Sequence, residues 1–142
     1  MKAIIEKYKD KGLRLTPQRI AILKFLEGNT SHPTAEDIYK KVKKEYPTIS
    51  FATVYNTLQT LRETGDVLEI TIDPARKHYD PELTPHNHIV CTECNEMMDV
   101  FVDYSSVLRL PSKILKDFQV IRNHVDFYGL CRECQMARKG VR

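Results

Sequence analysis

The stretch from Lys77 to Cys94 is dense in side chains that bind metal ions, above all Asp80, His86, His88, Cys91 and Cys94. His86 and His88 are two residues apart, so on a β-strand both imidazoles point to the same face. Cys91 and Cys94 form a C-x-x-C motif, whose short turn lets both sulfurs bind one tetrahedral ion. Because nitrogen and oxygen donors suit a different metal from sulfur donors, the stretch predicts two sites, each completed by ligands from elsewhere in the chain.

A second C-x-x-C motif, formed by Cys131 and Cys134, completes the sulfur donors. The chain has 4 cysteines, all in these two motifs, which predicts a closed four-thiolate zinc site. The 36 residues between the motifs exceed the gap of a simple zinc ribbon and predict a subdomain there. Unpaired reduced cysteines and a redox dithiol are the alternatives. A closed site has no open coordination position, so we expect this zinc to stabilise the fold.

The second predicted site combines His86 and His88 with Asp80. Its further candidate ligands are His32, Asp99 and His124. Imidazole and carboxylate ligands suit Fe(II), Mn(II) or Zn(II). His78 alternates with Asp80 and can share its strand face, but a lone histidine is more often a hydrogen-bonded polar residue than a ligand.

The composition is that of an ordinary globular chain with an uneven charge distribution. No apolar run approaches the ~18 residues of a membrane span. The charged N-terminus lacks the apolar core of a signal peptide, so we expect a cytoplasmic protein without a membrane partner, where reduced thiols favour metal binding. Residues 1–62 hold 12 Lys and Arg against 6 Asp and Glu, whereas residues 63–142 hold 10 against 13. A basic N-terminal part suggests an anionic partner, with a solvated lysine-rich surface as the alternative.

Capping and proline signals predict three helices before residue 47. The first spans residues 1–11 and is closed by Gly12. The second starts at Thr16–Pro17, a hydroxyl N-cap followed by proline at the first helical position, and ends at Gly28. The third opens at Thr34–Asp37, with acidic residues in its first turn, and stops before Pro47.

A fourth helix, capped by Ser50 and ended by Gly65, carries two different faces. One face is an apolar stripe made of Phe51, Val54, Leu58 and Leu61. The other holds hydrogen-bonding groups and little charge, with Thr53 and Asn56 on it and Tyr55 at its border. Short donors and acceptors suit base edges, whereas an exposed helix without a binding role usually carries more Lys–Glu pairs. The pattern predicts a recognition helix.

The remaining pattern predicts strands. Residues 67–72 and 77–80, separated by a turn at Asp73–Pro74, form a β-hairpin signature. Three helices followed by a hairpin describe a winged helix-turn-helix, with an unspecialised helical bundle as the alternative. Strands are expected over 86–90, 99–102 and 119–128, a short helix over 112–118, and a loose end over 139–142. The fold class is therefore α+β, with a winged helix over 1–80, a hinge over 81–85 and a small α/β domain over 86–142.

Five segments together resemble the Fur family of metal-dependent bacterial repressors, and within it the peroxide-responsive PerR branch. The segments are Leu15–Arg19, His32–Tyr39, Ala52–Leu58, His86–Cys94 and Tyr128–Cys134. The resemblance covers nearly the whole chain. It implies a winged helix that binds an inverted repeat in double-stranded DNA, and a C-terminal domain that forms a homodimer.

The resemblance also implies roles for individual residues. The structural zinc ligands match Cys91, Cys94, Cys131 and Cys134. The ligands of a regulatory Fe(II) or Mn(II) match His32, Asp80, His86, His88 and Asp99, of which His32 and His86 are the oxidation-sensitive pair. Tyr55 and Asn56 match recognition-helix contacts, with Thr53 on the same helix, and Arg14 matches a minor-groove contact. The chain departs from the family pattern at two places. Asn95 stands where glycine is common. Two ligands of a further metal site found in some members are absent, and His124 matches a remaining ligand of that site.

The expected function is a transcriptional repressor whose operator affinity is set by metal and by peroxide, not an enzyme and without a small-molecule substrate. An iron- or zinc-uptake regulator is the alternative within the family, where iron sensors tend to carry glutamate at the position of Asp99. A non-haem iron oxygenase is the alternative from another class, because it uses two histidines and one carboxylate. That chemistry also needs a substrate pocket, and the sequence offers no sign of one.

Overall fold

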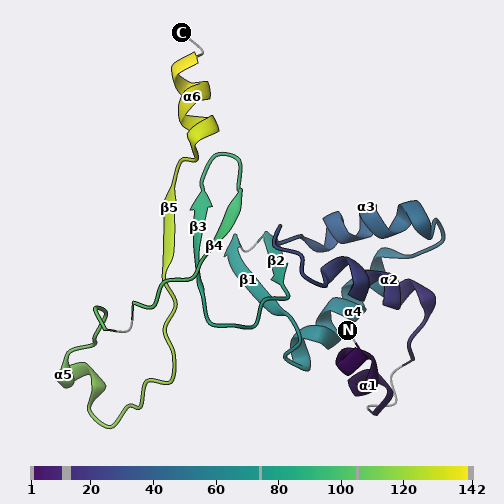
Figure 1. Ribbon diagram of the computed structural model, residues 1–142, viewed down its shortest axis with the longest axis horizontal. Coiled ribbons are helices and arrows are strands. Elements are labelled where there is room, and N and C mark those ends of the chain that lie inside the picture. Colours follow the sequence, from purple (N-terminus) through teal and green to yellow (C-terminus); the bar gives the residue numbers. More distant parts are fainter. Residues whose placement is uncertain (1, 11–13, 74, 105, 141–142) are drawn as a thin grey trace. The chain divides into compact units, whose positions relative to one another are not determined.

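The computed structural model describes residues 2–10, 14–73, 75–104 and 106–140 (Figure 1). The chain divides into two compact units, Met1–Leu83 and Thr84–Arg142, which we call the N-terminal and the C-terminal unit. The division lies within the segment 81–85. The described helices are all too short or too polar to span a lipid bilayer.

The four helices of the N-terminal unit are α1 (Lys2–Asp10), α2 (Pro17–Leu26), α3 (Ala35–Glu45) and α4 (Phe51–Glu63). The predicted caps are in place, since the hydroxyls of Thr16, Thr34 and Ser50 accept backbone N–H groups at 3.3, 3.2 and 3.1 Å. Asp37 accepts the N–H of Thr34 at 3.0 Å, which completes a capping box. Gly12, predicted to close α1, lies outside the described residues. The hydroxyls of Thr16, Thr34 and Ser50 each satisfy a backbone N–H group at a helix start that has no partner within the helix.

The apolar faces of these helices pack around a single core. Its fully buried members are Tyr8, Ile22, Leu23, Leu26, Ile38, Val42, Ile49, Val54, Leu58, Leu61, Val67 and Tyr79. Phe51 was predicted to join this core, and that prediction is wrong. Its side chain, at the first position of α4, is 43% exposed. Its ring instead meets the edge of Tyr39, with ring centroids 5.6 Å apart.

The hairpin of the N-terminal unit consists of β1 (Leu68–Asp73) and β2 (Arg76–Asp80), which pair antiparallel. Glu69 of β1 ties it to α4, because its carboxylate accepts Arg62 at 2.8 Å and Lys77 at 3.1 Å. Burial raises the pKa of Glu69, but the hydrogen bonds from Lys77 and Arg62 outweigh burial and hold that pKa below its ordinary value. Helices α2 to α4 and this hairpin form the predicted winged helix.

The C-terminal unit contains a three-stranded sheet with the order β4-β3-β5 (Figure 1). Strand β3 (Asn87–Cys91) pairs antiparallel with β4 (Met97–Val100) and parallel with β5 (Asp126–Gly129). The strand predicted over 119–128 is thus shorter and later, and the one predicted over 99–102 begins two residues earlier. The side chain of Asn87, on the central strand, links the segments on either side of it. It donates to the carbonyl of Val102 and accepts the N–H of Val125, each at 2.9 Å.

Two helices complete the C-terminal unit, α5 (Ser112–Leu115) and α6 (Arg132–Gly140). Helix α6 was not predicted, and the loose end expected from residue 139 is helical through Gly140. The unit has a thin core, in which Val90, Cys91 and Met97 are the buried apolar side chains among its described residues. A sheet with so little buried apolar surface needs another source of stability.

Candidate metal centres and nucleic-acid interface

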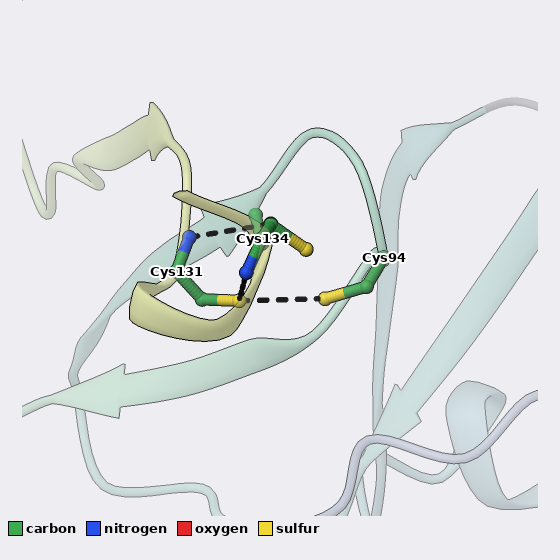
Figure 2. A group of neighbouring side chains, drawn as sticks. Cys94, Cys131 and Cys134 are labelled. Atoms are coloured by element: carbon green, nitrogen blue, oxygen red, sulfur yellow. Dashed lines mark hydrogen bonds between the residues drawn. The ribbon is translucent and has the colours of Figure 1, made fainter. Parts of the chain in front are cut away.

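The four cysteines come together at one end of the C-terminal sheet. Cys91 ends β3, Cys94 lies in the following turn, and Cys131 and Cys134 flank the first turn of α6. Their sulfur atoms all lie within 4.8 Å of one another, and none forms a disulfide. Figure 2 shows the sulfurs of Cys94 and Cys131 pointing toward each other, 3.9 Å apart. A tetrahedral zinc with ~2.3 Å bonds to sulfur separates its ligands by about 3.8 Å, so the cluster fits a closed structural zinc site.

Backbone geometry shapes the turn that carries Cys94. Asn95 has a φ of +62°, in the left-handed region that glycine and asparagine adopt most readily. The N–H of Asn95 donates to the carbonyl of Cys91 at 2.9 Å, and the N–H of Cys91 donates to the carbonyl of Glu96 at 2.9 Å. The departure from the family's glycine therefore preserves the turn, because asparagine tolerates this conformation.

The thiols of the cluster differ in acidity. The backbone N–H groups of Cys131 and Cys94 point at the Cys91 sulfur and lower the pKa of Cys91 to about 6. Hydrogen bonds of the Cys134 thiol with the sulfurs of Cys131 and Cys91 raise the pKa of Cys134 to about 12, because they favour its protonated form. A divalent cation takes the place of the proton and keeps all four sulfurs ionised. The donor set and its electrostatics both call for a bound cation.

The C-terminal unit also gathers His86, His88 and Asp99. Asp99 of β4 lies opposite His88 of β3 in the register of the sheet, and His86 directly precedes β3. The Nε2 atoms of the two histidines are 3.0 Å apart, and Asp99 Oδ1 lies 3.1 Å from His86 and 3.3 Å from His88. Nitrogen and oxygen ligands about 2.1 Å from an ion lie about 3 Å apart when they bind at right angles. The spacing of these three donors therefore matches three neighbouring positions in the coordination shell of one metal ion.

Hydrogen bonding orients His86 for this role. Its Nδ1 lies 2.7 Å from the carbonyl oxygen of Thr84, which can only accept, so Nδ1 carries the proton. The lone pair of Nε2 then faces His88 and Asp99. A carbonyl behind the ring of a metal-binding histidine is a recurrent arrangement, because it fixes tautomer and ring orientation together.

The N-terminal unit brings together the other two predicted ligands, His32 and Asp80. His32 lies in the loop before α3 and Asp80 ends β2, and His32 Nε2 is 3.4 Å from Asp80 Oδ2. Both side chains are buried, with exposed fractions of 1% and 0%. The second Asp80 oxygen accepts the N–H of Glu82 at 2.9 Å. The N-terminal unit thus presents one imidazole and one carboxylate as a buried pair.

The third histidine of the C-terminal unit takes a different partner. His124 Nε2 lies 2.6 Å from Asp126 Oδ1, and the same oxygen is 3.8 Å from His88 Nδ1. Asp126 was not predicted from the sequence as a site residue. Its only signal was its spacing of two residues from His124, which places both on one side of an extended chain.

The predicted DNA-contacting residues all lie in the N-terminal unit. Tyr55 and Asn56 are exposed on α4, and Arg14 is exposed ahead of α2. Thr53 is half-buried, and its hydroxyl is 2.9 Å from that of Ser50, so it takes part in capping α4. Tyr55, Asn56 and Arg14 are therefore the better placed for DNA among these residues.

A winged helix, a closed thiolate cluster and histidine–carboxylate sets in both units define a DNA-binding protein with metal centres. The sequence profile of the ferric uptake regulator family matches residues 10–128. The peroxide operon regulator of Bacillus subtilis (strain 168) is 37% identical over 134 residues, which cover 94% of this chain and 92% of that protein. The chain belongs to the ferric uptake regulator family, whose members are transcription regulators.

Solved structures of similar proteins agree with this fold. The peroxide stress regulator of Campylobacter jejuni is 33% identical with a TM-score of 0.64, covering 94% of this chain and 98% of that one. PerR from Streptococcus pyogenes, described in a study of peroxide sensing and gene regulation, is 30% identical with a TM-score of 0.53, covering 94% and 91%. The similarity therefore extends over both units of the chain.

Proposed function

We propose that this chain is a cytoplasmic, homodimeric repressor that binds an inverted-repeat operator when metal is bound and releases it after peroxide. The observation that carries the proposal is the set of His86, His88 and the half-buried Asp99, whose spacing fits three ligands on one side of a metal ion. The names of its relatives in Bacillus subtilis and Campylobacter jejuni, which refer to peroxide, support the choice of signal.

The regulatory ion takes ligands from both units in this proposal. The N-terminal unit offers His32 and Asp80, and the C-terminal unit offers His86, His88 and Asp99. Neither set alone satisfies an ion that binds five or six donors, so binding draws the two units into one arrangement. Mixed imidazole and carboxylate ligation suits Fe(II) and Mn(II), whereas the thiolate cluster suits zinc.

Oxidation of a ligand is the proposed response to peroxide. Fe(II) held by these residues would supply the redox chemistry that activates peroxide, and the oxidation would leave its charge unchanged overall. An imidazole ring of His32 or His86 then gains one oxygen atom in place of a C–H hydrogen, and the other peroxide oxygen leaves as water. The carboxylates of Asp80 and Asp99 resist this reaction. An oxidised imidazole is a poor ligand, so the ion leaves and the two units are free to separate.

A dimer is supported by the exposed apolar surface of the C-terminal unit. Residues 106–125 extend away from the sheet (Figure 1), and some of them, from Leu108 to Val125, line a hollow of about 720 Å³. Apolar side chains of the unit that are exposed include Phe101, Leu110, Ile114, Phe118, Ile121 and Phe127. So many large apolar side chains exposed on one small unit indicate a surface that a partner covers, so we place the homodimer interface here. A second copy also brings a second recognition helix, as an inverted repeat requires.

The His88→Ala variant tests the proposed regulatory site. We expect the zinc-loaded variant to remain a dimer but to bind operator DNA at least about tenfold more weakly in Mn(II), because losing a ligand releases the orientation of the winged helices. Fluorescence anisotropy with a labelled operator measures affinity, and sedimentation measures the dimer. Met98→Ala, at an exposed position of β4 next to Asp99, is the control and should bind as the wild type. Wild-type operator affinity of His88→Ala with Fe(II), Mn(II) and Zn(II) would refute the regulatory site.

Tyr55→Ala and Arg14→Ala test the DNA-binding surface. Each should weaken operator binding by about 1–3 kcal/mol, because a base-edge or groove contact is lost, while metal content and thermal stability stay unchanged. Lys44→Ala, at an exposed position of α3, is the control for the loss of one positive charge. Operator affinities of the alanine variants equal to wild type across salt concentrations would remove these residues from the interface.

A further inference from the structure

His32 has an unusual backbone conformation for a side chain with a proposed ligand role. Its φ is +52°, in the left-handed region that residues other than glycine rarely adopt, and the residue is buried. Such a conformation is strained and persists only where surrounding contacts hold it. The contacts that hold His32 therefore also decide where its imidazole points.

Strand β2 contacts the His32 loop at three successive residues. His78 Nδ1 lies 2.6 Å from the carbonyl oxygen of His32, the N–H of Tyr79 donates to the carbonyl of Pro33 at 2.9 Å, and Asp80 lies beside the His32 ring. Thr34 and His78 form an antiparallel bridge. The loop before α3 is thus paired along β2 like a short additional strand.

The contact of His78 is directional. A carbonyl oxygen can only accept a hydrogen bond, so at 2.6 Å the Nδ1 atom of His78 carries the proton and donates it. The Nδ1–H group of His78 thus binds the backbone of His32. Asp80, two residues further along the same strand, contacts the His32 side chain. Strand β2 therefore holds both the backbone carbonyl and the imidazole of His32, and these two contacts restrain its left-handed backbone conformation.

We infer that His78 is a positioning residue for the regulatory metal: its Nδ1–H group holds the His32 carbonyl and so aims the His32 imidazole at the ion. The inference rests on the proposed function, in which His32 is a ligand. Fixing a ligand before the ion arrives removes an ordering cost from binding, as outer-shell hydrogen bonds do at other metal sites.

Two substitutions separate the hydrogen bond from the shape of the residue. His78→Leu removes the donor, whereas His78→Asn places an amide N–H₂ where Nδ1 was. Arg76→Leu, exposed on the same strand, controls for a general disturbance of β2. Mn(II) affinity of the zinc-loaded full-length chain is measured by electron paramagnetic resonance of free Mn(II). We expect a loss of about 10–100-fold in His78→Leu, and at most about threefold in the other two.

Wild-type Mn(II) affinity in His78→Leu would overturn the inference, and so would an equal loss in His78→Asn and His78→Leu. A second readout needs no metal at the regulatory site. Long-range ¹H–¹⁵N spectra should show the Nδ1-protonated form of His78, and backbone shifts should show a positive φ at His32 that disappears in His78→Leu. A positive φ retained in that variant would contradict the positioning role.

His32→Ala distinguishes failure of the inference from failure of the proposed function. If His32→Ala weakens Mn(II) binding and His78→Leu does not, His32 is a ligand and the role of His78 is wrong. If His32→Ala binds Mn(II) as the wild type does, the ligand assignment itself is wrong, and the inference fails with it.

Discussion

Replacing Cys91 or Cys131 by serine is expected to unfold the C-terminal unit and abolish dimerisation. Structural zinc contributes on the order of 10 kcal/mol of apparent binding free energy, which is comparable to the whole stability of a small domain. The thin core around Val90 and Met97 offers little to replace it. Zinc content by atomic absorption, circular dichroism and sedimentation equilibrium together measure the effect.

The N-terminal unit provides an internal reference for this experiment, because its core is separate and contains no cysteine. Its helical signal and its thermal transition should persist in Cys91→Ser. Met136→Ser, on exposed α6 two residues after the last cysteine, is the matched control and should keep zinc, fold and dimer. A zinc-free cysteine variant that stayed a folded dimer would show that the cluster is not structural.

The second large effect is expected when the Fe(II) form meets a brief low dose of peroxide. Operator affinity should fall to that of the metal-free protein, and the peptides containing His32 or His86 should gain about sixteen mass units. Both imidazoles are proposed ligands, so they lie within reach of the oxidant. The four cysteines should react more slowly, because zinc withdraws charge from their sulfurs and leaves no open position. Tandem mass spectrometry locates the added oxygen.

The Mn(II) form is the control, since Mn(II) performs this chemistry poorly, and it should repress without gaining mass. The peptide with His124 serves as an internal control, because this histidine lies outside the proposed ligand set. Oxidation confined to Cys91, Cys94, Cys131 and Cys134 would replace the histidine mechanism by a thiol switch. Absence of any oxidation would favour an iron-uptake regulator.

Local signals were sufficient for the N-terminal unit. Thr16, Thr34 and Ser50 begin helices because their hydroxyls accept backbone N–H groups within the next turn, and that requires nothing from the rest of the chain. Gly28 and Gly65 follow helices with φ values of +68° and +76°, which their lack of a side chain allows. Phe51 was misassigned because helical periodicity does not tell where the core ends along a helix.

The C-terminal unit depends more on pairing between distant segments, and the predictions there were less accurate. Strand β5 is limited to the residues that pair with β3, although a strand was predicted from Gln119, because the sequence does not show which residues find a partner strand. Helix α6 was missed because its charged sequence buries no residue and lacks an apolar stripe. The C-x-x-C spacing placed four donors in one cluster, whereas the pairing of His124 with Asp126 had no comparable spacing rule.

The parallel pairing of β3 with β5 has a consequence for the order of folding. The N–H of Val125 meets the side chain of Asn87 across 38 residues, and Cys131 meets Cys91 across 40, so the sheet closes a long loop before it gains these contacts. The helices of the N-terminal unit begin at local caps, and this unit needs only residues up to Leu83, although some of its contacts join residues as far apart as Lys7 and Asp66. During synthesis the winged helix can therefore fold while the last strand is still unmade. A newly made chain would acquire its DNA-reading helix first, and its metal-sensing sheet only once zinc joins the two ends of the loop.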